Sequence, residues 1–305
     1  ISIHLHMDTK NPVAIYRNKK RLINIIKKYD INIVHARSRA PAWSAYLAAK
    51  SKKVAFVTTF HGTYGTKNYF KRLYNSVMTK GDAVIAISEF IRDHIKKIYN
   101  VAKPVQVIPR GVNLDIFSPK KVTNARMISL ANKLKITEVD YIILMPGRLT
   151  EWKGQKHAIQ AISRIKTLNV RLIIVGDKQG RKRYEKSLIK YAKHFKVQSK
   201  VQLVEHSRDL PAFMMLSDLI LSCSTKPEAF GRVILEAQAM GRPVIAYEHG
   251  GAVELLEYNE NGILCEPNNI EELAKNIDLI LGYSNSKRKI LSQKSISNVK
   301  KKISN

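Results

Sequence analysis

Residues Lys226–Gly251 read KPEAFGRVILEAQAMGRPVIAYEHGG and place a loop, a helix and a strand one after another. Strong helix formers fill Val233–Met240, and Gly241 stands where a helix commonly ends in a glycine cap. The apolar run Pro243–Tyr247 is typical of a buried parallel strand. This stretch therefore predicts a helix that begins near Gly231 and leads directly into a strand, as in an α/β fold.

The start of this predicted helix is suited to binding phosphate. A helix N-terminus leaves backbone N–H groups unpaired, and Gly231 has no side chain to keep a ligand away. Glu236 follows about one and a half turns later, within reach of sugar hydroxyls beside such a phosphate. Taken alone, an amphipathic helix with Glu236 on a solvated face explains the same residues.

Length and composition indicate a globular protein. The 305 residues allow two domains with separate cores, and the hydrophobic content of 45% and charged content of 25% are ordinary. No apolar run approaches the roughly 18 residues that a membrane span requires. Cys223 and Cys265 lie far apart without a CxxC motif, which favours two buried thiols in a reducing, cytoplasmic compartment.

The net charge of +29 favours phosphate-bearing partners in general. The basic residues are spread along the chain without the aromatic platforms of single-strand binders, so no specific nucleic-acid partner is predicted. A predicted helix from Asn11 to Tyr29 carries basic residues opposite Leu22, Ile25 and Ile26. That helix could rest on anionic lipid at the inner face of the membrane, and a solvated polar face explains it equally well.

Short apolar runs alternate with helical stretches along both halves of the chain, which predicts parallel sheets. Ala36–Pro41 is predicted as a polar loop before a helix over Ala42–Lys50. The predicted strands are residues 31–35, 54–59, 83–87 and 105–108 in the first half, and 141–145, 171–175, 201–204, 219–222 and 243–247 in the second.

Ligands of open α/β sheets bind at the carboxyl ends of the strands, and several candidate residues fall there. Arg148 and Lys153 share a glycine-flanked loop after strand 141–145, where two cations could neutralise a diphosphate; solvated surface cations are the alternative. Gly176 closes strand 171–175, and His61 closes strand 54–59 beside a glycine. A strand-end histidine paired with neighbouring backbone is the alternative for His61.

Metal or cofactor chemistry is not predicted. The sequence has no Asp-x-Asp, no HExxH and no Cys/His cluster, and the close pair His4 and His6 stands near the terminus without further ligands.

Glu228 and Glu236 with seven residues between them, Phe230-Gly231 after the first, and Gly-x-Pro-Val-Ile-Ala behind resemble the GT-B glycosyltransferases of family 4. Members of that family use nucleotide-sugar donors, retain the anomeric configuration and extend glycans and glycolipids. The resemblance implies two doubly wound, Rossmann-like α/β domains that face each other across a cleft. It also implies that Glu228 contacts the donor sugar and Glu236 the ribose. The donor phosphates would meet the backbone of Phe230, Gly231, Arg232 and Val233.

The same resemblance implies that Arg148 and Lys153 contact the donor's phosphates, and that His61 lies near the donor sugar and the acceptor. Gly176 belongs to a loop like the family's Val-Gly-x-Gly, with Lys178 where a glycine is common. The expected activity is metal-independent transfer to a glycan or lipid-linked acceptor. The expected parts are an acceptor-side domain (1–118), a linker (119–140), a nucleotide-sugar-binding domain (141–282) and a Lys-rich tail (283–305).

Two further functions remain open at this point. One is a basic protein that binds nucleic acid or a membrane surface with a non-catalytic GT-B-like fold, and the other is a sugar-nucleotide epimerase. Family members normally begin with a strand and a Gly-rich loop upstream of Ile1. We therefore expect these 305 residues to bind donor through the second domain and to transfer sugar slowly.

Overall fold

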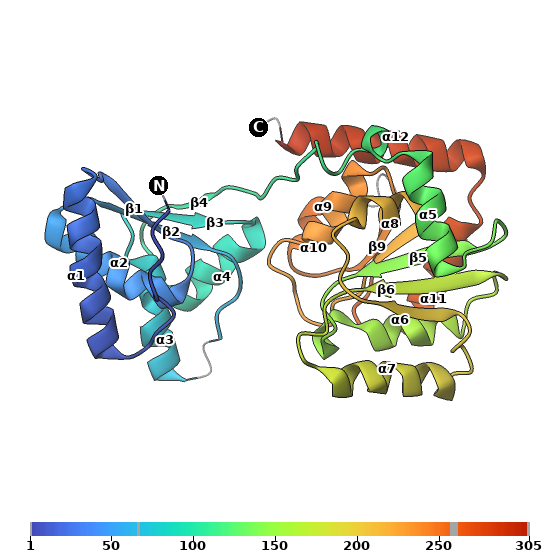
Figure 1. Ribbon diagram of the computed structural model, residues 1–305, viewed down its shortest axis with the longest axis horizontal. Helices are drawn as coiled ribbons and strands as arrows, with labels where there is room; N and C mark the ends of the chain where they lie inside the picture. The colour runs from blue at the N-terminus through green and yellow to red at the C-terminus, as the bar shows by residue number, and fades with distance from the viewer. Residues whose placement is uncertain (1, 66–67, 257–261, 304–305) are drawn as a thin grey trace. The chain divides into compact units, whose positions relative to one another are not determined.

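The computed structural model describes residues 2–65, 68–256 and 262–303 (Figure 1). The chain divides into two compact units, Ile1–Arg110 and Gly111–Asn305, and each is described by itself. Each unit contains one parallel sheet with helices between its strands, so the predicted α/β class is confirmed. Within the described residues, no helix has the length and hydropathy that crossing a bilayer requires.

The first unit has a four-stranded sheet in the order β1-β2-β3-β4, which matches the four strands predicted. Every pair of neighbouring strands is parallel. Its elements are α1 (Pro12–Lys28), β1 (Ile33–Ala36), α2 (Arg39–Lys52), β2 (Ala55–Phe60), α3 (Tyr69–Asn75), η1 (Ser76–Thr79), β3 (Ala83–Ala86), α4 (Glu89–Tyr99) and β4 (Val105–Val107).

The helix starts in this unit follow local rules. The Asn11 side chain caps α1 by accepting hydrogen bonds from the backbone of Val13 and Ala14. The loop predicted over Ala36–Pro41 is wrong at its C-terminal end, because α2 already begins at Arg39. Pro41 lies in the first turn of α2, where a missing backbone N–H costs nothing.

The second unit has a six-stranded parallel sheet in the order β10-β9-β8-β5-β6-β7. Five of these strands were predicted, and β10 was not. The elements are η2 (Pro119–Lys121), α5 (Asn124–Leu134), β5 (Tyr141–Pro146), η3 (Glu151–Lys153), α6 (Gln155–Ile162), β6 (Val170–Val175), α7 (Lys182–His194), β7 (Val201–Val204), α8 (Leu210–Leu216), β8 (Leu219–Ser222), α9 (Arg232–Ala239), β9 (Val244–Tyr247), α10 (Gly251–Leu255), β10 (Ile263–Cys265), α11 (Ile270–Leu281) and α12 (Asn285–Ile303).

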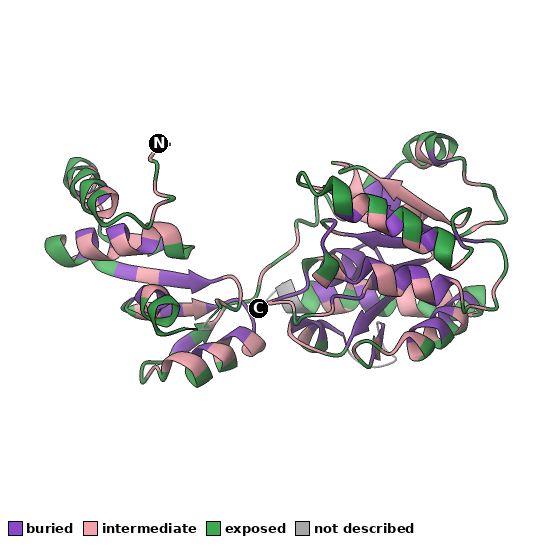
Figure 2. Cartoon of the chain, turned by 90° about the horizontal axis from the view of Figure 1, so that it is seen from below, coloured by how far each residue is buried: buried purple, intermediate pink, exposed green. Residues whose placement is uncertain are grey.

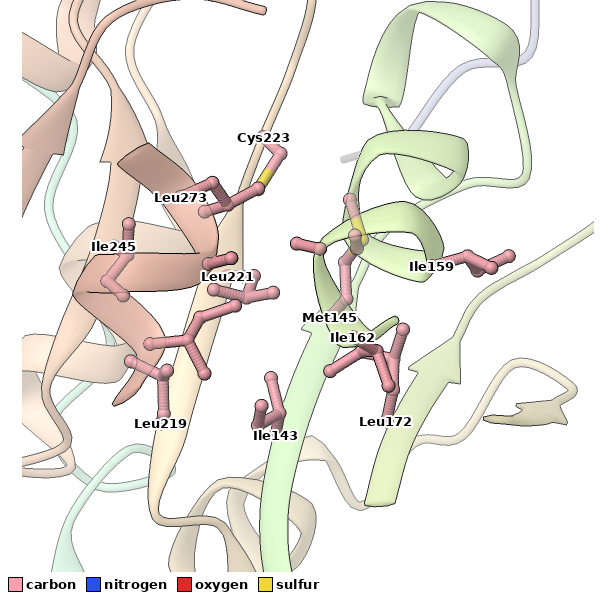
Figure 3. Close-up of a cluster of buried hydrophobic side chains, with 14 of the residues drawn as sticks. Ile143, Met145, Ile159, Ile162, Leu172, Leu219, Leu221, Cys223, Ile245 and Leu273 are labelled. Carbon is pink, nitrogen blue, oxygen red and sulfur yellow. The ribbon is translucent and has the colours of Figure 1, made fainter. Parts of the chain in front are cut away.

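Helices cover both faces of this second sheet. In Figure 1, α6, α7 and α11 lie on one face and α5, α8, α9 and α12 on the other. The strands are buried between the layers, while the helices turn exposed residues outward (Figure 2). Side chains from β5, β6 and β8 meet Ile159 and Ile162 of α6 in the core (Figure 3). The residues expected as a Lys-rich tail instead form α12, which packs against α9.

The sheet order decides where the functional loops lie. The strands β5 and β8 are neighbours, with Ile143 beside Leu219 and Leu144 beside Ile220, although two strands separate them in sequence. Because the strands are parallel, the loops that follow β5 and β8 emerge at the same edge of the sheet. Both cysteines are buried free thiols, as predicted; Cys223 follows β8 and Cys265 ends β10.

Candidate functional site

Two charged residues predicted separately from the sequence are in direct contact at this edge. Lys153, the last residue of η3, donates a hydrogen bond from Nζ to Oε1 of Glu228 over 2.7 Å. Their side chains are only 15% and 18% exposed. The hydroxyl of Ser224 donates to the same carboxylate oxygen. A largely shielded ion pair thus joins the loop after β5 to the loop after β8.

Backbone contacts hold the Glu228 loop in place. The N–H of Gly251 donates to the carbonyl of Glu228 over 2.8 Å. A Cβ on Gly250 would lie 2.5 Å from that same oxygen, so a side chain has no room there, and its φ of +62° also favours glycine. The two glycines that end the Lys226–Gly251 stretch therefore position Glu228.

The loop that carries Arg148 is fixed in a similar way. A Cβ on Gly176 would lie 1.8 Å from the carbonyl oxygen of Gly147, so glycine at 176 allows the loops after β5 and β6 to touch. Leu149 donates its N–H to the carbonyl of Asp177 over 3.0 Å. The Arg148 side chain itself is exposed, at the same sheet edge as Lys153.

The helix α9 begins at Arg232, with Gly231 as N-cap and no side chain capping the first turn. Its first amides therefore lie at the positive end of a helix. Glu236, one turn on, is 6% exposed and accepts a hydrogen bond from Nη2 of Arg232 over 2.8 Å. Burial raises the pKa of Glu236, and the neighbouring Arg232 opposes that rise. The Phe230 side chain is buried in the core and Val233 is half-buried, so a ligand would meet their backbone.

His61 belongs to the first unit and lies just after β2. Nη2 of Arg110 is 2.8 Å from its Nδ1, and Nε of Arg37 is 3.4 Å from its Nε2. A neutral imidazole has one acceptor nitrogen, so only one of the two guanidiniums can donate to it at a time. Burial, Arg110, Arg37 and His35 together lower the pKa of His61 to about 4.

Sequence reasoning missed two residues that hold this site. One is Ser224, on Glu228. The other is Gln155, which donates to the Arg148 carbonyl over 2.9 Å and accepts from the Tyr184 hydroxyl over 2.9 Å. Only their positions in the sequence could have indicated these two residues. Ser224 lies just after the predicted strand 219–222, and Gln155 directly follows the loop glycine Gly154.

Comparison with known proteins decides the family. The model of the glycosyl transferases group 1 matches residues 128–298, more than half of the chain, and that of glycosyltransferase family 4 matches residues 2–116. The chain belongs to the glycosyl transferases group 1. This membership favours a glycosyltransferase over a non-catalytic polyanion-binding protein or an epimerase.

Solved glycosyltransferases share the GT-B fold of this group 1 chain. A glycosyltransferase from Rickettsia africae is 39% identical with a TM-score of 0.91, and the match covers 98% of this chain and 80% of that one. HepE of Anabaena, solved with UDP, has a TM-score of 0.84 at 23% identity, covering 93% and 77%. The N-acetyl-alpha-D-glucosaminyl L-malate synthase of Bacillus anthracis is 24% identical over 280 residues, 87% of this chain and 71% of that protein.

Proposed function

We propose that this glycosyltransferase moves a sugar from a nucleotide-sugar donor to a glycan or lipid-linked acceptor, with retention of anomeric configuration and without a metal ion. The observation that carries the proposal is the Lys153–Glu228 pair at the carboxyl ends of β5 and β8. It places a cation suited to a diphosphate next to a carboxylate suited to sugar hydroxyls. The resemblance to family 4 supports retention.

In this proposal the diphosphate meets Arg148, Lys153 and the first amides of α9. Negative charge builds up on the leaving diphosphate during transfer, and preplaced cations and N–H groups stabilise that charge. Arg offers a bidentate fork and Lys a compact charge, which suits a site that neutralises phosphate without a metal. Arg232 donates to one carboxylate oxygen of Glu236, Oε1. In this proposal the other carboxylate oxygen accepts hydrogen bonds from the ribose hydroxyls of the donor.

For His61 we propose a hydrogen-bonding role towards the acceptor or the donor sugar. A pKa of about 4 makes imidazole a weak general base at neutral pH, since effective bases have pKa values near the working pH. Both ring nitrogens face a guanidinium, Nδ1 that of Arg110 and Nε2 that of Arg37, so a sugar oxygen would have to replace one of these two contacts.

A thermal-shift screen with nucleotide sugars and free nucleoside diphosphates tests donor binding. Uridine nucleotides come first, because HepE, which shares the fold, has been solved with UDP and with UDP-glucose. We expect stabilisation of the wild type and of Lys190→Ala, an exposed control on α7, and little shift for Arg148→Ala/Lys153→Ala. No shift with any nucleotide sugar, or equal shifts in all three proteins, would contradict the proposal.

Transfer itself is tested with the donor that binds best and a panel of glycan and lipid-linked acceptors. NMR of the product should show the anomeric configuration of the donor, and EDTA should leave donor binding unchanged. An inverted product would refute retention, and loss of donor binding in EDTA would refute metal independence.

A further inference from the structure

A pocket lies beside these loops, between residues that precede and begin α6 and the start of α7. Its volume is about 1120 Å³, and its walls come from residues 150–152, the start of α6, residues 180–187 and residues 225–226. Lys153 and Glu228 are not part of its lining. The pocket is therefore next to the ion pair without containing it.

The lining of this pocket is strongly basic. Five cations face one carboxylate, that of Glu151. Across the described part of the chain, no ion pair joins any of these five cations to an acidic side chain. Cations gathered in a concave site repel one another and attract anions. The five are Lys156, Arg181, Lys182, Arg183 and Lys226.

The start of α7 adds to the positive charge. The helix begins at Lys182, and no side chain caps its first turn. Lys182 and Arg183 thus stand at the positive end of the helix dipole, where acidic residues are usually favoured. Cations are disfavoured at this end, and the acidic residue of the first turn, Glu185, lies 3.7 Å from Nζ of Lys178. Local rules broken in this way are expected at functional sites, where a ligand offsets the cost.

A buried hydroxyl on the same wall points independently to a ligand. Thr150 lines the pocket, is 8% exposed, and its Oγ1 has no hydrogen-bond partner among the described residues. A buried polar group without a partner is unfavourable, because it has lost its hydrogen bonds to water. A phosphate oxygen would supply the partner once the Thr150 side chain turns its hydroxyl, now shielded from solvent, into the pocket.

We infer that this basic pocket is a binding site for a phosphate-bearing ligand, separate from the proposed donor site. The ligand is either a free phosphorylated compound or the headgroup of an anionic phospholipid, which present the same chemistry to the pocket. The site does not depend on the proposed transfer reaction, since its cations and Thr150 lie outside the residues assigned to the donor. Two of the loops that line the pocket are joined by a hydrogen bond, in which the N–H of Thr225 donates to the carbonyl of Trp152 over 2.7 Å.

Isothermal titration with inorganic pyrophosphate in low salt tests the site, once without UDP and once with saturating UDP to occupy the proposed donor site. The pocket variant is Lys182→Gln/Arg183→Gln. The matched control, Lys186→Gln/Lys190→Gln, removes the same charge from exposed positions of the same helix that do not line the pocket. All four positions are exposed and glutamine suits a helix, so both variants should fold.

We expect pyrophosphate to bind wild type and control alike, and the pocket variant at least about tenfold more weakly, as the loss of a charge-assisted hydrogen bond implies. Thr150→Val, which keeps the shape and removes the hydroxyl, should weaken binding up to about tenfold. Equal affinity in pocket variant and control would overturn the inference. So would a complete block of pyrophosphate binding by UDP, which would place the anion in the donor site.

Sedimentation with phosphatidylglycerol and phosphatidylcholine vesicles separates the two sources. Weaker binding of both pyrophosphate and phosphatidylglycerol vesicles by the pocket variant than by the control assigns the site to a lipid headgroup. Equal vesicle binding together with weaker pyrophosphate binding assigns it to a free phosphorylated compound. Equal behaviour of both variants in both assays refutes the site altogether.

Discussion

The contact between Lys153 and Glu228 makes a quantitative prediction about stability. At 2.7 Å and an effective dielectric constant of about 20, the Coulomb attraction is on the order of 6 kcal/mol before desolvation is subtracted. After that subtraction, hydrogen bonds to charged groups contribute about 1.5–3 kcal/mol. Because the two side chains are largely shielded, we expect a coupling free energy of about 2 kcal/mol, well above the value for an exposed pair.

A double-mutant cycle measures this coupling. Lys153→Met keeps the alkyl stem and removes the charge, and Glu228→Gln keeps the shape and removes the opposite charge. The chain has one tryptophan in each unit, Trp43 and Trp152, so a Trp43→Phe background makes urea unfolding, followed by fluorescence, report on the second unit alone. Nζ of Lys153 lies 4.7 Å from the centre of the Trp152 ring, so replacing Lys153 changes the fluorescence of the folded state. The variants are therefore compared by the midpoints of their urea unfolding curves and not by fluorescence intensity.

Each single variant should lower the free energy of unfolding, and the double variant should lower it by about 2 kcal/mol less than the sum of the two. In a thermal scan, 1 kcal/mol corresponds to about 2–4 °C for a unit of this size. A coupling below about 0.5 kcal/mol would refute the reasoning, because that is the value of a solvated surface pair. Ser224→Ala is the control: it removes the other partner of Glu228 and leaves the ion pair in place.

The remaining predictions concern binding and pH. Glu236→Ala should weaken nucleoside binding by about 1–3 kcal/mol without unfolding the protein, because the ribose hydroxyls lose a hydrogen-bond acceptor. Unchanged nucleoside affinity in a calorimetric titration would show that Glu236 is not part of the site. Arg148→Ala and Lys153→Ala should each weaken nucleoside diphosphate binding far more than nucleoside binding; equal losses would exclude direct phosphate contact. The pKa of His61 is lowered to about 4, so an NMR titration should find it neutral at pH 6. Because the unfolded chain takes up this proton near pH 6.5, the contribution of His61 to stability is complete above pH 6.5 and is lost as the pH falls from 6.5 to 4. Arg110→Gln should raise the pKa of His61. A titration midpoint near 6.5 for His61 in the wild type would contradict its contact with Arg110.

The fold was largely predictable because its strands are short apolar runs separated by turn residues. Runs such as Ile142–Met145 are buried on both faces, and in a parallel sheet they are apolar throughout. The strand β10 was missed because Ile263–Cys265 is too short to show a pattern. The helix α12 was missed because its sequence is Lys-rich with little apolar periodicity, and helices of this kind gain stability from packing, here against α9.

For the candidate site, sequence identified charged residues but not their contacts. Lys153 and Glu228 are brought together by the order of strands in the sheet, which no local pattern encodes. The need for glycine at positions 176 and 250 likewise arises only in the folded chain, because a side chain at either position would collide with a backbone oxygen of a loop distant in sequence. The basic run Arg181–Arg183 is visible in the sequence, but only the folded chain shows that it shares a pocket with Thr150, Lys156 and Lys226.

Under the proposed mode of donor binding, the ion pair would link stability to donor binding. Lys153 cannot give its full charge to Glu228 and to a diphosphate at once, so a bound diphosphate must offset part of the roughly 2 kcal/mol that the pair contributes. Glu228 would then keep the Ser224 hydroxyl and need one further donor. A hydroxyl of the transferred sugar can be that donor, whereas a nucleoside diphosphate lacks the sugar that would bring a hydroxyl to this position. If Lys153 and Glu228 bind the donor as we propose, this pair would favour a donor that carries its sugar over the product nucleotide that has lost it.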